Sequence, residues 1–383
     1  MPAKLTIRDI ARLAGVSTAT VSRVLNNKPD VDPATRERIM SIVNEQRYVP
    51  SATASSLAGG RSSLLGVLVP SLTWPLMPNI LQGIAEVIEQ TAYELVLYSI
   101  SHRTDRSSLI DHILSTRLIA GLIAVYPDGI ARAEMMNDGN PEASSHLVEL
   151  YQHGLPLVIL DDQRLPSATP WVGPDNRIGA YEAVKHLVNL GHRRIAYIQG
   201  PLQYQCSHDR FDGYQQALRE AQIEVDPSLI FQGDFNTPSG YSAGMQLLQL
   251  PERPTAVFVA NDQMAWGVLA AGREQKLRLP EDLAVIGFDD TALSAHTRPA
   301  LTTVRQPFQE MGKSAAELLL TLVSMPKNLN NGWYDPVSHL VRAHAGMDKK
   351  NPVHVQLPTE LIIRESCGTP QHEQVPEFRI PIN

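Results

Sequence analysis

The chain has 383 residues, of which 43% are hydrophobic and 19% are charged. These ordinary globular proportions exclude a disordered, collagen-like or coiled-coil protein, and the length predicts two or three packed units. The two cysteines, Cys206 and Cys367, are too few for a disulfide framework or a zinc cluster, which indicates a reducing compartment. The sequence shows no apolar signal segment and no run of about 18 apolar residues, so we expect a cytoplasmic protein without a membrane span.

The net charge of -7, taken alone, argues against a nucleic-acid partner, but this charge is unevenly distributed. Residues 1–61 hold nine Lys or Arg against five Asp or Glu, whereas the remainder holds 24 against 35. A basic unit joined to an acidic one predicts an anionic partner for the first unit only. A solvated helical surface with a slight excess of cations explains the same charge equally well.

Two short helices are predicted at the start of the basic unit. Thr6 and Asp9 have the spacing of a capping box, and Gly15 can end the first helix in a left-handed conformation. Ser17 is a good N-cap for a second helix from Thr18 to Leu25. The Gly turn between the two helices is typical of a helix-turn-helix.

A third helix follows, capped by Asp32 with Pro33 at its first position. The outward face of the second helix is small and polar, so it can enter a major groove, and its N-terminus suits phosphates. A three-helix core without a DNA role is the alternative. The run from Thr6 to Asn26, however, resembles the headpiece signature of the lactose-repressor (LacI) family of bacterial transcription regulators. The resemblance continues to Arg364 and covers most of the chain.

The resemblance implies specific contacts with double-stranded DNA. Thr18 and Ala19 match the family's base-reading positions, and Arg23 matches a residue that reaches a guanine edge. Ser17, Thr20 and Asn26 fall where the family grips phosphates. The candidate DNA-binding residues are Thr6, Ser17, Thr18, Ala19, Thr20, Arg23, Asn26, Ala54 and Leu57.

Residues 51–61 are short and rich in Ala and Ser, which by itself favours a flexible linker. The resemblance implies a hinge helix that orders only on DNA and pairs in the minor groove with its copy from a second subunit. Leu57 then matches a leucine wedge that kinks the duplex, and Ala54 is small enough for close helix approach. Residues 1–50 would form the headpiece, of which two are needed to read a pseudo-palindromic operator.

After Arg61 the pattern changes to alternating strands and helices. Strands are expected at 64–69, 95–100, 121–125, 157–160, 194–199, 229–232, 256–260 and 283–287. Helices are expected at 79–92, 107–116, 146–153, 178–190, 211–221, 240–250 and 264–275. Such alternation predicts an α/β fold whose parallel sheets are covered on both faces, and the number of strands predicts two subdomains. This matches the resemblance, since the family's core is similar to periplasmic sugar-binding proteins.

The core is expected at 62–366, with its first subdomain at 62–163 and 300–327 and its second at 164–299 and 328–366. Residues 132–145 and 326–351 exceed the family's usual core, and 367–383 are expected to form a mobile tail. The lack of a leucine heptad favours a homodimer over a tetramer.

Polar residues at predicted strand ends are the candidate ligands of a small effector, because ligands in such folds bind beyond the carboxyl ends of the strands. Carboxylates, amides and an arginine can bind paired hydroxyls, and aromatic faces cover a sugar ring. The candidates at strand ends are Ser71, Trp74, Asp161, Asn261 and Asp289, and Gln306 lies at an expected crossover back to the first subdomain. The resemblance implies two more: Arg210 stands where the family carries its effector-gripping arginine, and Phe235 matches an aromatic residue that packs on the ligand. Capping would also explain Asn261 and Asp289, and simple packing Trp74 and Phe235; for Arg210 and Asp289 ligand binding is favoured.

Catalytic, metal and cofactor sites are not predicted. The sequence has no Gly-x-Ser-x-Gly, His-Glu-x-x-His or Cys-x-x-Cys motif, and Gly312-Lys313-Ser314 only resembles the end of a phosphate loop within a helix. The sequence therefore predicts a nucleoid-associated repressor whose operator affinity is modulated by a sugar-like effector, with induction and corepression both open. The alternative is a sugar receptor or sugar-processing enzyme whose headpiece is incidental.

Overall fold

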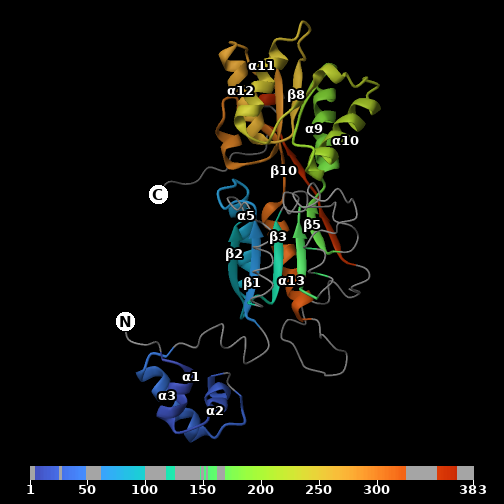
Figure 1. Cartoon of the computed structure of the whole chain (residues 1–383). Helices are drawn as coiled ribbons and strands as arrows, with labels where there is room; N and C mark the ends of the chain where they lie inside the picture. Colours follow the sequence, from blue (N-terminus) through green and yellow to red (C-terminus); the bar gives the residue numbers. More distant parts are fainter. Residues whose placement is uncertain are drawn as a thin grey trace, which may run out of the picture. The chain divides into compact units, whose positions relative to one another are not determined.

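The structure is a computed structural model that describes residues 5–25, 28–48, 62–99, 118–125, 147, 151, 154–161, 169–324 and 352–368. The chain divides into a small unit, residues 1–63 with 113–119, and a large unit that holds the other residues. The small unit contains the three helices near the N-terminus, and the large unit contains two sheets with their covering helices (Figure 1).

Three helices form the headpiece at the predicted positions: α1 (Ile7–Ala14), α2 (Thr18–Leu25) and α3 (Pro33–Glu45). Asp9 Oδ2 accepts hydrogen bonds from the Thr6 backbone nitrogen at 2.9 Å and from the Thr6 hydroxyl at 2.7 Å. Gly15 ends α1 with φ of 64°, and Asp32 caps α3 by accepting from the nitrogen of Thr35 at 3.0 Å. Seven buried residues fill the space between the helices: Ile10, Ala11, Ala14, Val21, Val24, Ile39 and Val43.

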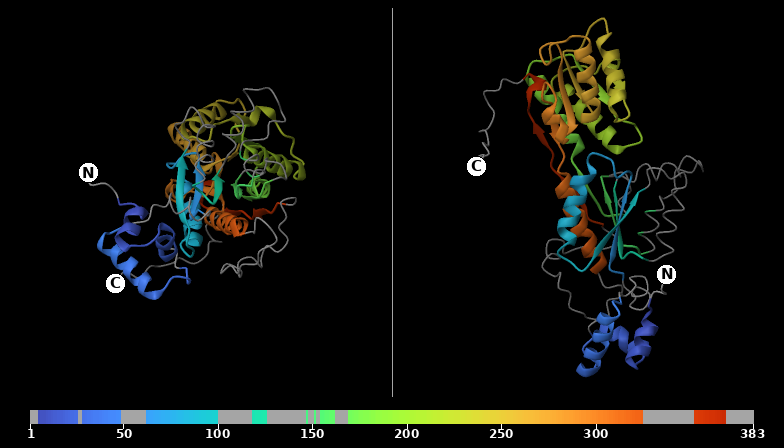
Figure 2. Two further views of the ribbon diagram at one scale, coloured as in Figure 1. Left: turned by 60° about the horizontal axis from the view of Figure 1, so that its bottom comes forward. Right: turned by 90° about the vertical axis from the view of Figure 1, so that its left-hand side faces the viewer.

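The first sheet of the core has six parallel strands in the order β11-β5-β4-β3-β1-β2. Their bounds are β1 (Leu64–Val69), β2 (Glu94–Ser99), β3 (Gly121–Val125), β4 (Leu157–Leu160), β5 (Trp171–Pro174) and β11 (His354–Leu357). Strands β1, β3 and β4 are apolar and almost entirely buried, as expected of a parallel sheet. Helices α5 (Met77–Ile88) and α13 (Phe308–Ser324) lie side by side against one face of this sheet (Figure 2).

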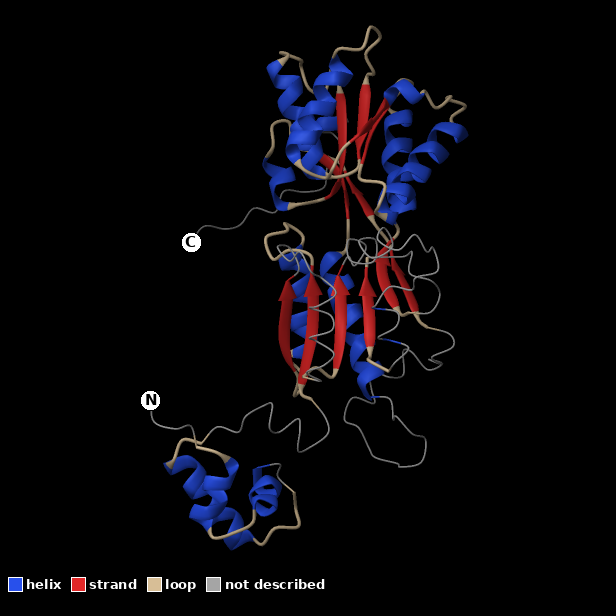
Figure 3. Cartoon of the chain, in the orientation of Figure 1, coloured by secondary structure: helices blue, strands red, loops and turns tan. Residues whose placement is uncertain are grey.

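The second sheet has the order β12-β10-β9-β8-β6-β7, in which only the edge strand β12 is antiparallel to its neighbour. The bounds are β6 (Ile195–Gln199), β7 (Ile230–Gln232), β8 (Ala256–Val259), β9 (Ala284–Asp289), β10 (Thr302–Arg305) and β12 (Glu360–Ile362). One face is covered by α9 (Asn176–Asn189) and α10 (Gln205–Glu220), the other by α11 (Thr237–Leu248) and α12 (Asp262–Glu274) (Figure 3). Short 3-10 turns are η1 (Pro227–Leu229), η2 (Ala292–His296) and η4 (Glu365–Cys367).

The strand order of the two sheets differs from the expected subdomain boundaries. β5 belongs to the first sheet although 164–299 was assigned to the second subdomain, and β10 pairs with β9 in the second sheet although 300–327 was assigned to the first. The C-terminal residues are shared, because β11 joins the first sheet and β12 the second. The expected tail also begins too early, since Cys367 is buried in η4.

Several predictions concern residues outside the described ranges. These are the hinge helix at 51–61, the helix at 107–116, most of the helix at 146–153, the long segments at 132–145 and 326–351, and the tail beyond residue 368.

The chain passes between the two sheets three times: from β5 to α9, from β10 to α13, and from β11 to β12. Two of these connections are bonded to each other. The Asp175 nitrogen donates to the carbonyl of Leu357 at 2.8 Å, and the Thr359 hydroxyl donates to the carbonyl of Asp175 at 3.3 Å.

Helices α5 and α13 cross in close contact at a pair of glycines. A Cβ on Gly83 would lie 2.0 Å from the carbonyl oxygen of Gln309, and a Cβ on Gly312 would lie 2.2 Å from that of Ile80. The Gly312-Lys313-Ser314 run is therefore the middle of a packed helix, where Lys313 forms an ion pair with Glu86 at 3.0 Å.

Candidate DNA interface and effector site

The start of α2 presents the candidate base-reading side chains. Ser17 Oγ accepts from the Thr20 nitrogen at 3.1 Å and lies 2.9 Å from the Thr20 hydroxyl, so Ser17 is the helix cap. Thr18 and Ala19 are exposed beside it. Arg23 is also exposed and lies one helical turn after Ala19, on the same face.

Arg23 forms an ion pair with Asp30 at 3.2 Å, and both side chains are more than half exposed. An exposed pair of this kind contributes little to stability, so Arg23 can exchange it for a DNA contact. Thr6 is half of the α1 capping box. Asn26, Ala54 and Leu57 lie outside the described residues.

In the core, Arg210 lies in the second turn of α10, because this helix begins at Gln205, six residues before the expected start. Its side chain is 3% exposed, and two of its nitrogens donate to groups of the protein. Nε donates to Asn176 Oδ1 at 2.9 Å, and NH1 donates to the carbonyl of Ala260 at 2.5 Å. The guanidinium carbon lies 3.8 Å from the ring centroid of Phe288.

Asp289 and Gln306 complete this cluster at the carboxyl ends of β9 and β10. Asp289 Oδ1 accepts from Gln306 Nε2 at 2.6 Å and lies 3.9 Å from Arg210 NH1. Both side chains are buried, and Gln306 Oε1 accepts no hydrogen bond from any described residue. Burial raises the pKa of Asp289 to about 8; the Arg210 charge opposes this shift, and the charges of Asp262 and Asp161 add to it.

Asp161, which follows β4 of the first sheet, is one of the charges that raise the pKa of Asp289 in the second. Asp161 is 7% exposed. The charge of a residue after a strand of the first sheet thus acts on a carboxyl group at a strand end of the second, and ligand sites in this fold class lie beyond such strand ends.

Some of the candidate effector residues have strained backbone conformations. Asp161, Phe235 and Asp289 all have positive φ, of 68°, 69° and 118°. Non-glycine residues rarely adopt this region, and strain of this kind gathers at functional sites. Three of the eight candidate effector residues, taken from three different strand ends, thus share an unusual conformation.

Phe235 packs against a wall that only glycine permits. A Cβ on Gly200 would lie 2.2 Å from the Phe235 ring and 2.7 Å from the hydroxyl of Ser207. The Tyr204 ring centroid lies 5.8 Å from that of Phe235. Asn261 holds this loop, since its Nδ2 donates to the Phe235 carbonyl at 2.9 Å while its Oδ1 caps α12 at the nitrogen of Met264.

The two candidates after β1 have local partners. The Ser71 hydroxyl lies 2.9 Å from the Thr73 hydroxyl and accepts from the Thr73 nitrogen at 3.2 Å. Trp74 is half-buried and packs against the core of the first sheet. Trp74 thus shows the packing that was its alternative role.

Sequence reasoning missed three buried neighbours of the site: Asn176, Asp262 and Phe288. Asn176 follows β5, a four-residue strand containing Gly and Pro that gave no strand signal. Asp262 accepts from Thr303 Oγ1 at 2.5 Å, Ser294 Oγ at 2.7 Å and the Thr291 nitrogen at 2.8 Å. Burial nevertheless raises the pKa of Asp262. Its place beside Asn261 at a strand end was the available signal.

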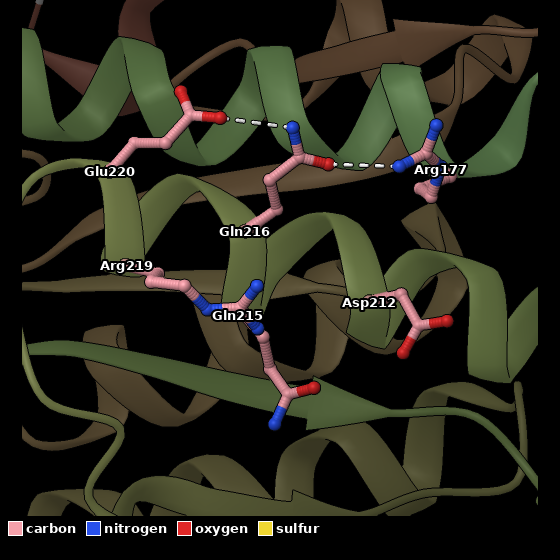
Figure 4. A pocket seen from close by; sticks show the side chains of 6 residues that line it. All are labelled: Arg177, Asp212, Gln215, Gln216, Arg219 and Glu220. Carbon is pink, nitrogen blue, oxygen red and sulfur yellow. Dashed lines mark hydrogen bonds between the residues drawn. The ribbon is translucent and has the colours of Figure 1, made fainter.

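A separate surface pocket of about 440 Å³ lies on α9 and α10 rather than at the strand ends. Gln216 bridges it by accepting from Arg177 and donating to Glu220, each at 3.0 Å, while Arg219, Gln215 and Asp212 line the rest (Figure 4). Across the described part of the chain, no group of three or more His, Cys, Asp or Glu is placed to hold a metal. In the same residues, no helix has the length and apolar character needed to cross a membrane.

Comparisons with known proteins agree with both units. Residues 6–51 match the model of the "Bacterial regulatory proteins, lacI family", and residues 184–367 match a "Periplasmic binding protein-like domain". The chain is 35% identical to the HTH-type transcriptional repressor CytR of Escherichia coli (strain K12), over 82% of this chain and 89% of CytR.

Solved structures give the same result. The Lac repressor dimer bound to operator and the anti-inducer ONPF is similar with a TM-score of 0.74 and 30% identity, covering 95% of this chain and 99% of the repressor. The transcriptional regulator CelR in complex with cellobiose is similar with a TM-score of 0.64 and 29% identity, covering 94% of this chain and 99% of that one.

These relatives are transcriptional regulators and not enzymes, so the comparisons favour a DNA-binding regulator over the alternative of a sugar-processing enzyme. The matched headpiece, the two-sheet core and an identity of 35% to a repressor over 82% of the chain lead to one conclusion: the chain belongs to the LacI family of DNA-binding transcription regulators.

Proposed function

We propose that this regulator is a homodimer that represses transcription from a pseudo-palindromic operator, and that a small carbohydrate bound at the strand ends of the core changes its operator affinity. The observation that carries this proposal is the buried polar cluster of Arg210, Asp289 and Gln306, in which Asp289 has a positive φ. Burying a polar cluster of this kind lowers the stability of the fold. We infer that the cluster is retained because the function needs it.

The exposed face of α2 supports the DNA contacts. Thr18 and Ala19 offer short hydroxyl and methyl groups to base edges, and Arg23 offers a fork suited to guanine. One headpiece reads too few bases for useful specificity, so two headpieces on one dimer are required. In this proposal the protein acts in the cytoplasm at the nucleoid, and Leu57 wedges the central base step.

Operator binding is tested with the full chain and a pseudo-palindromic duplex selected from random DNA. The binding constant should fall steeply with salt and exceed that for random DNA at every salt concentration. Leu57→Ala should weaken specific binding and bending more than nonspecific binding. A flat salt response or equal losses on both DNAs would refute the DNA part.

Effector binding is tested by a thermal-shift screen of sugars and nucleosides. A ligand of the strand-end cluster should raise the Tm of the wild type and not that of Arg210→Ala. Arg219→Ala is the matched control, because Arg219 lies on the same helix but is exposed. A hit that survives Arg210→Ala would place the ligand elsewhere.

A further inference from the structure

Two arginines share one buried carboxylate just beyond β9 in the second sheet. Asp290 Oδ2 accepts from Arg305 Nε at 2.7 Å, and Oδ1 accepts from Arg364 NH2 at 2.6 Å. The Asp290 side chain is 7% exposed, so without these partners it would be an uncompensated buried charge. Arg364 is itself held to the sheet, because its NH1 donates to the carbonyl of Leu301 at 2.8 Å. The ion pairs therefore fix the end of β9 against β10 and against the residues that follow β12.

The Asp290–Arg305 ion pair stands at two of the three connections between the sheets. Arg305 is the last residue of β10, and only Gln306 and Pro307 separate it from α13, which packs on the first sheet. Arg305 NH1 also donates to Glu360 Oε2 at 3.2 Å. Glu360 is the first residue of β12, directly after the connection from β11. One guanidinium therefore holds the ends of both connections where they meet the second sheet.

The same ion pair borders the effector cluster. Asp289 Oδ1 accepts from Gln306 Nε2 at 2.6 Å, and their chain neighbours Asp290 and Arg305 form the ion pair. Asp289 and Asp290 both have positive φ, of 118° and 55°, which non-glycine residues keep only where surrounding contacts fix the backbone. A ligand that moves Asp289 or Gln306 therefore also moves one partner of the ion pair, since a single peptide bond joins them.

We propose that Asp290 and Arg305 are positioning residues, which transmit a change in the effector cluster to the relative orientation of the two sheets. This inference rests on the proposed function, because it adds to that function the residues that carry its regulation. Without the ion pair, a ligand still binds at the strand ends, but the two connections no longer follow it. The regulator then keeps its effector and loses part of its response on the operator.

The first test compares the full chain with Arg305→Gln, because the Arg305 side chain is 48% exposed and its loss should leave the fold intact. The probes are the sugars and nucleosides that raise the Tm of the wild type, and operator affinity is measured with and without each of them. In Arg305→Gln each compound should still raise the Tm, whereas the factor by which it changes operator affinity should fall at least about threefold. Asp290→Asn should show the same loss, and the double variant should lose no more than Asp290→Asn, because both changes remove one interaction.

Asp226→Asn is the matched control. It breaks an ion pair in which Arg194 NH1 lies 2.9 Å from Asp226 Oδ2, but this pair lies at the start of β6 and borders no connection between the sheets. The control should keep the wild-type factor. An undiminished factor in Arg305→Gln, or an equal loss in Asp226→Asn, would overturn the inference. So would a loss of the Tm shift in Arg305→Gln, which would place Arg305 at the ligand.

A second measurement needs no effector, so it separates this inference from the proposed function. Spin labels are attached at Ala92→Cys, after α5, and at Arg219→Cys on α10; both positions are exposed, and both native cysteines are buried. Labelled chain is diluted into unlabelled chain, so that distances within one subunit are measured. Their distribution should be broader in Arg305→Gln than in the wild type or in Asp226→Asn. If no sugar or nucleoside raises the Tm of the wild type, the proposed effector function fails, whereas an unchanged distribution in Arg305→Gln would overturn this inference.

Discussion

At the scale of single residues, the effector site combines features that a stable core would avoid. Asp161, Phe235 and Asp289 have left-handed backbones, and the carboxyl group of Asp289 is buried beside two others. Each feature costs of the order of 1–3 kcal/mol, so their coincidence at strand ends points to binding and away from stability.

Asp289 provides a prediction about pH. Because burial raises its pKa to about 8, the folded protein keeps a proton there that the unfolded chain releases near pH 4. The stability from this proton is complete below about pH 4 and is lost as the pH rises through 8. Without ligand, the free energy of unfolding should therefore fall between pH 5 and 8.5, as measured by urea denaturation.

In Asp289→Asn this decline should be shallower, and the variant should be more stable than the wild type at pH 8.5 although it no longer binds effector. Asp262, whose pKa is raised for the same reason, contributes to the residual slope. Asp212→Asn should follow the wild-type curve. A loss of stability in Asp289→Asn at pH 8.5 would show instead that Arg210 needs an ionised partner.

At the scale of elements, most of the fold could be predicted from continuous apolar runs and from helix-capping residues. The headpiece helices were predicted because Thr6, Ser17 and Asp32 are local signals that the structure confirms. Strands β1, β3 and β4 were found because they are buried on both faces and read as continuous apolar runs.

Other elements could not be found, because their signals are not local. β5, β11 and β12 have three or four residues each, and their strand character comes from pairing with partners far along the chain. For the same reason the boundary between subdomains was misplaced. Asp289 and Gln306 could be proposed from their positions and Arg210 from the family resemblance, but their common cluster depends on the order of the second sheet.

The crossing of α5 and α13 gives a prediction at this scale. Gly312→Ala should destabilise the protein by about 2–3 kcal/mol, because its Cβ would lie 2.2 Å from the Ile80 carbonyl and backbone cannot move aside cheaply. Chemical denaturation measures this loss, which opposes the higher helix propensity of Ala.

Gly244→Ala on α11 is the control. There the nearest atom is the methyl group of Ala271, at 3.1 Å, so the propensity gain should roughly cancel a small strain. Equal effects of the two substitutions would show that the α5–α13 contact is not tight.

At the scale of the whole molecule, the headpiece and the core carry net charges of opposite sign. The headpiece residues hold an excess of Lys and Arg, and the rest of the chain an excess of Asp and Glu. In the proposed function, the DNA site and the effector site are coupled through a dimer, and such coupling is reciprocal.

The reciprocal coupling predicts that operator DNA changes the affinity for the effector by the same factor as the effector changes the affinity for the operator. Calorimetric titration of the effector with and without a saturating operator duplex measures the first factor, and DNA binding with and without effector measures the second. A factor of one in either experiment would contradict regulation by this ligand.

The three chain connections between the sheets limit what an effector can do. Only Pro358 and Thr359 lie between β11 and β12, so the Cα atoms of Leu357 and Glu360 can never be more than roughly 11 Å apart. The hydrogen bonds of Asp175 and Thr359 join this short tether to the connection that follows β5. These short connections limit the two halves of the core to rotation about a hinge. A ligand can change the angle between the halves, but it cannot separate them.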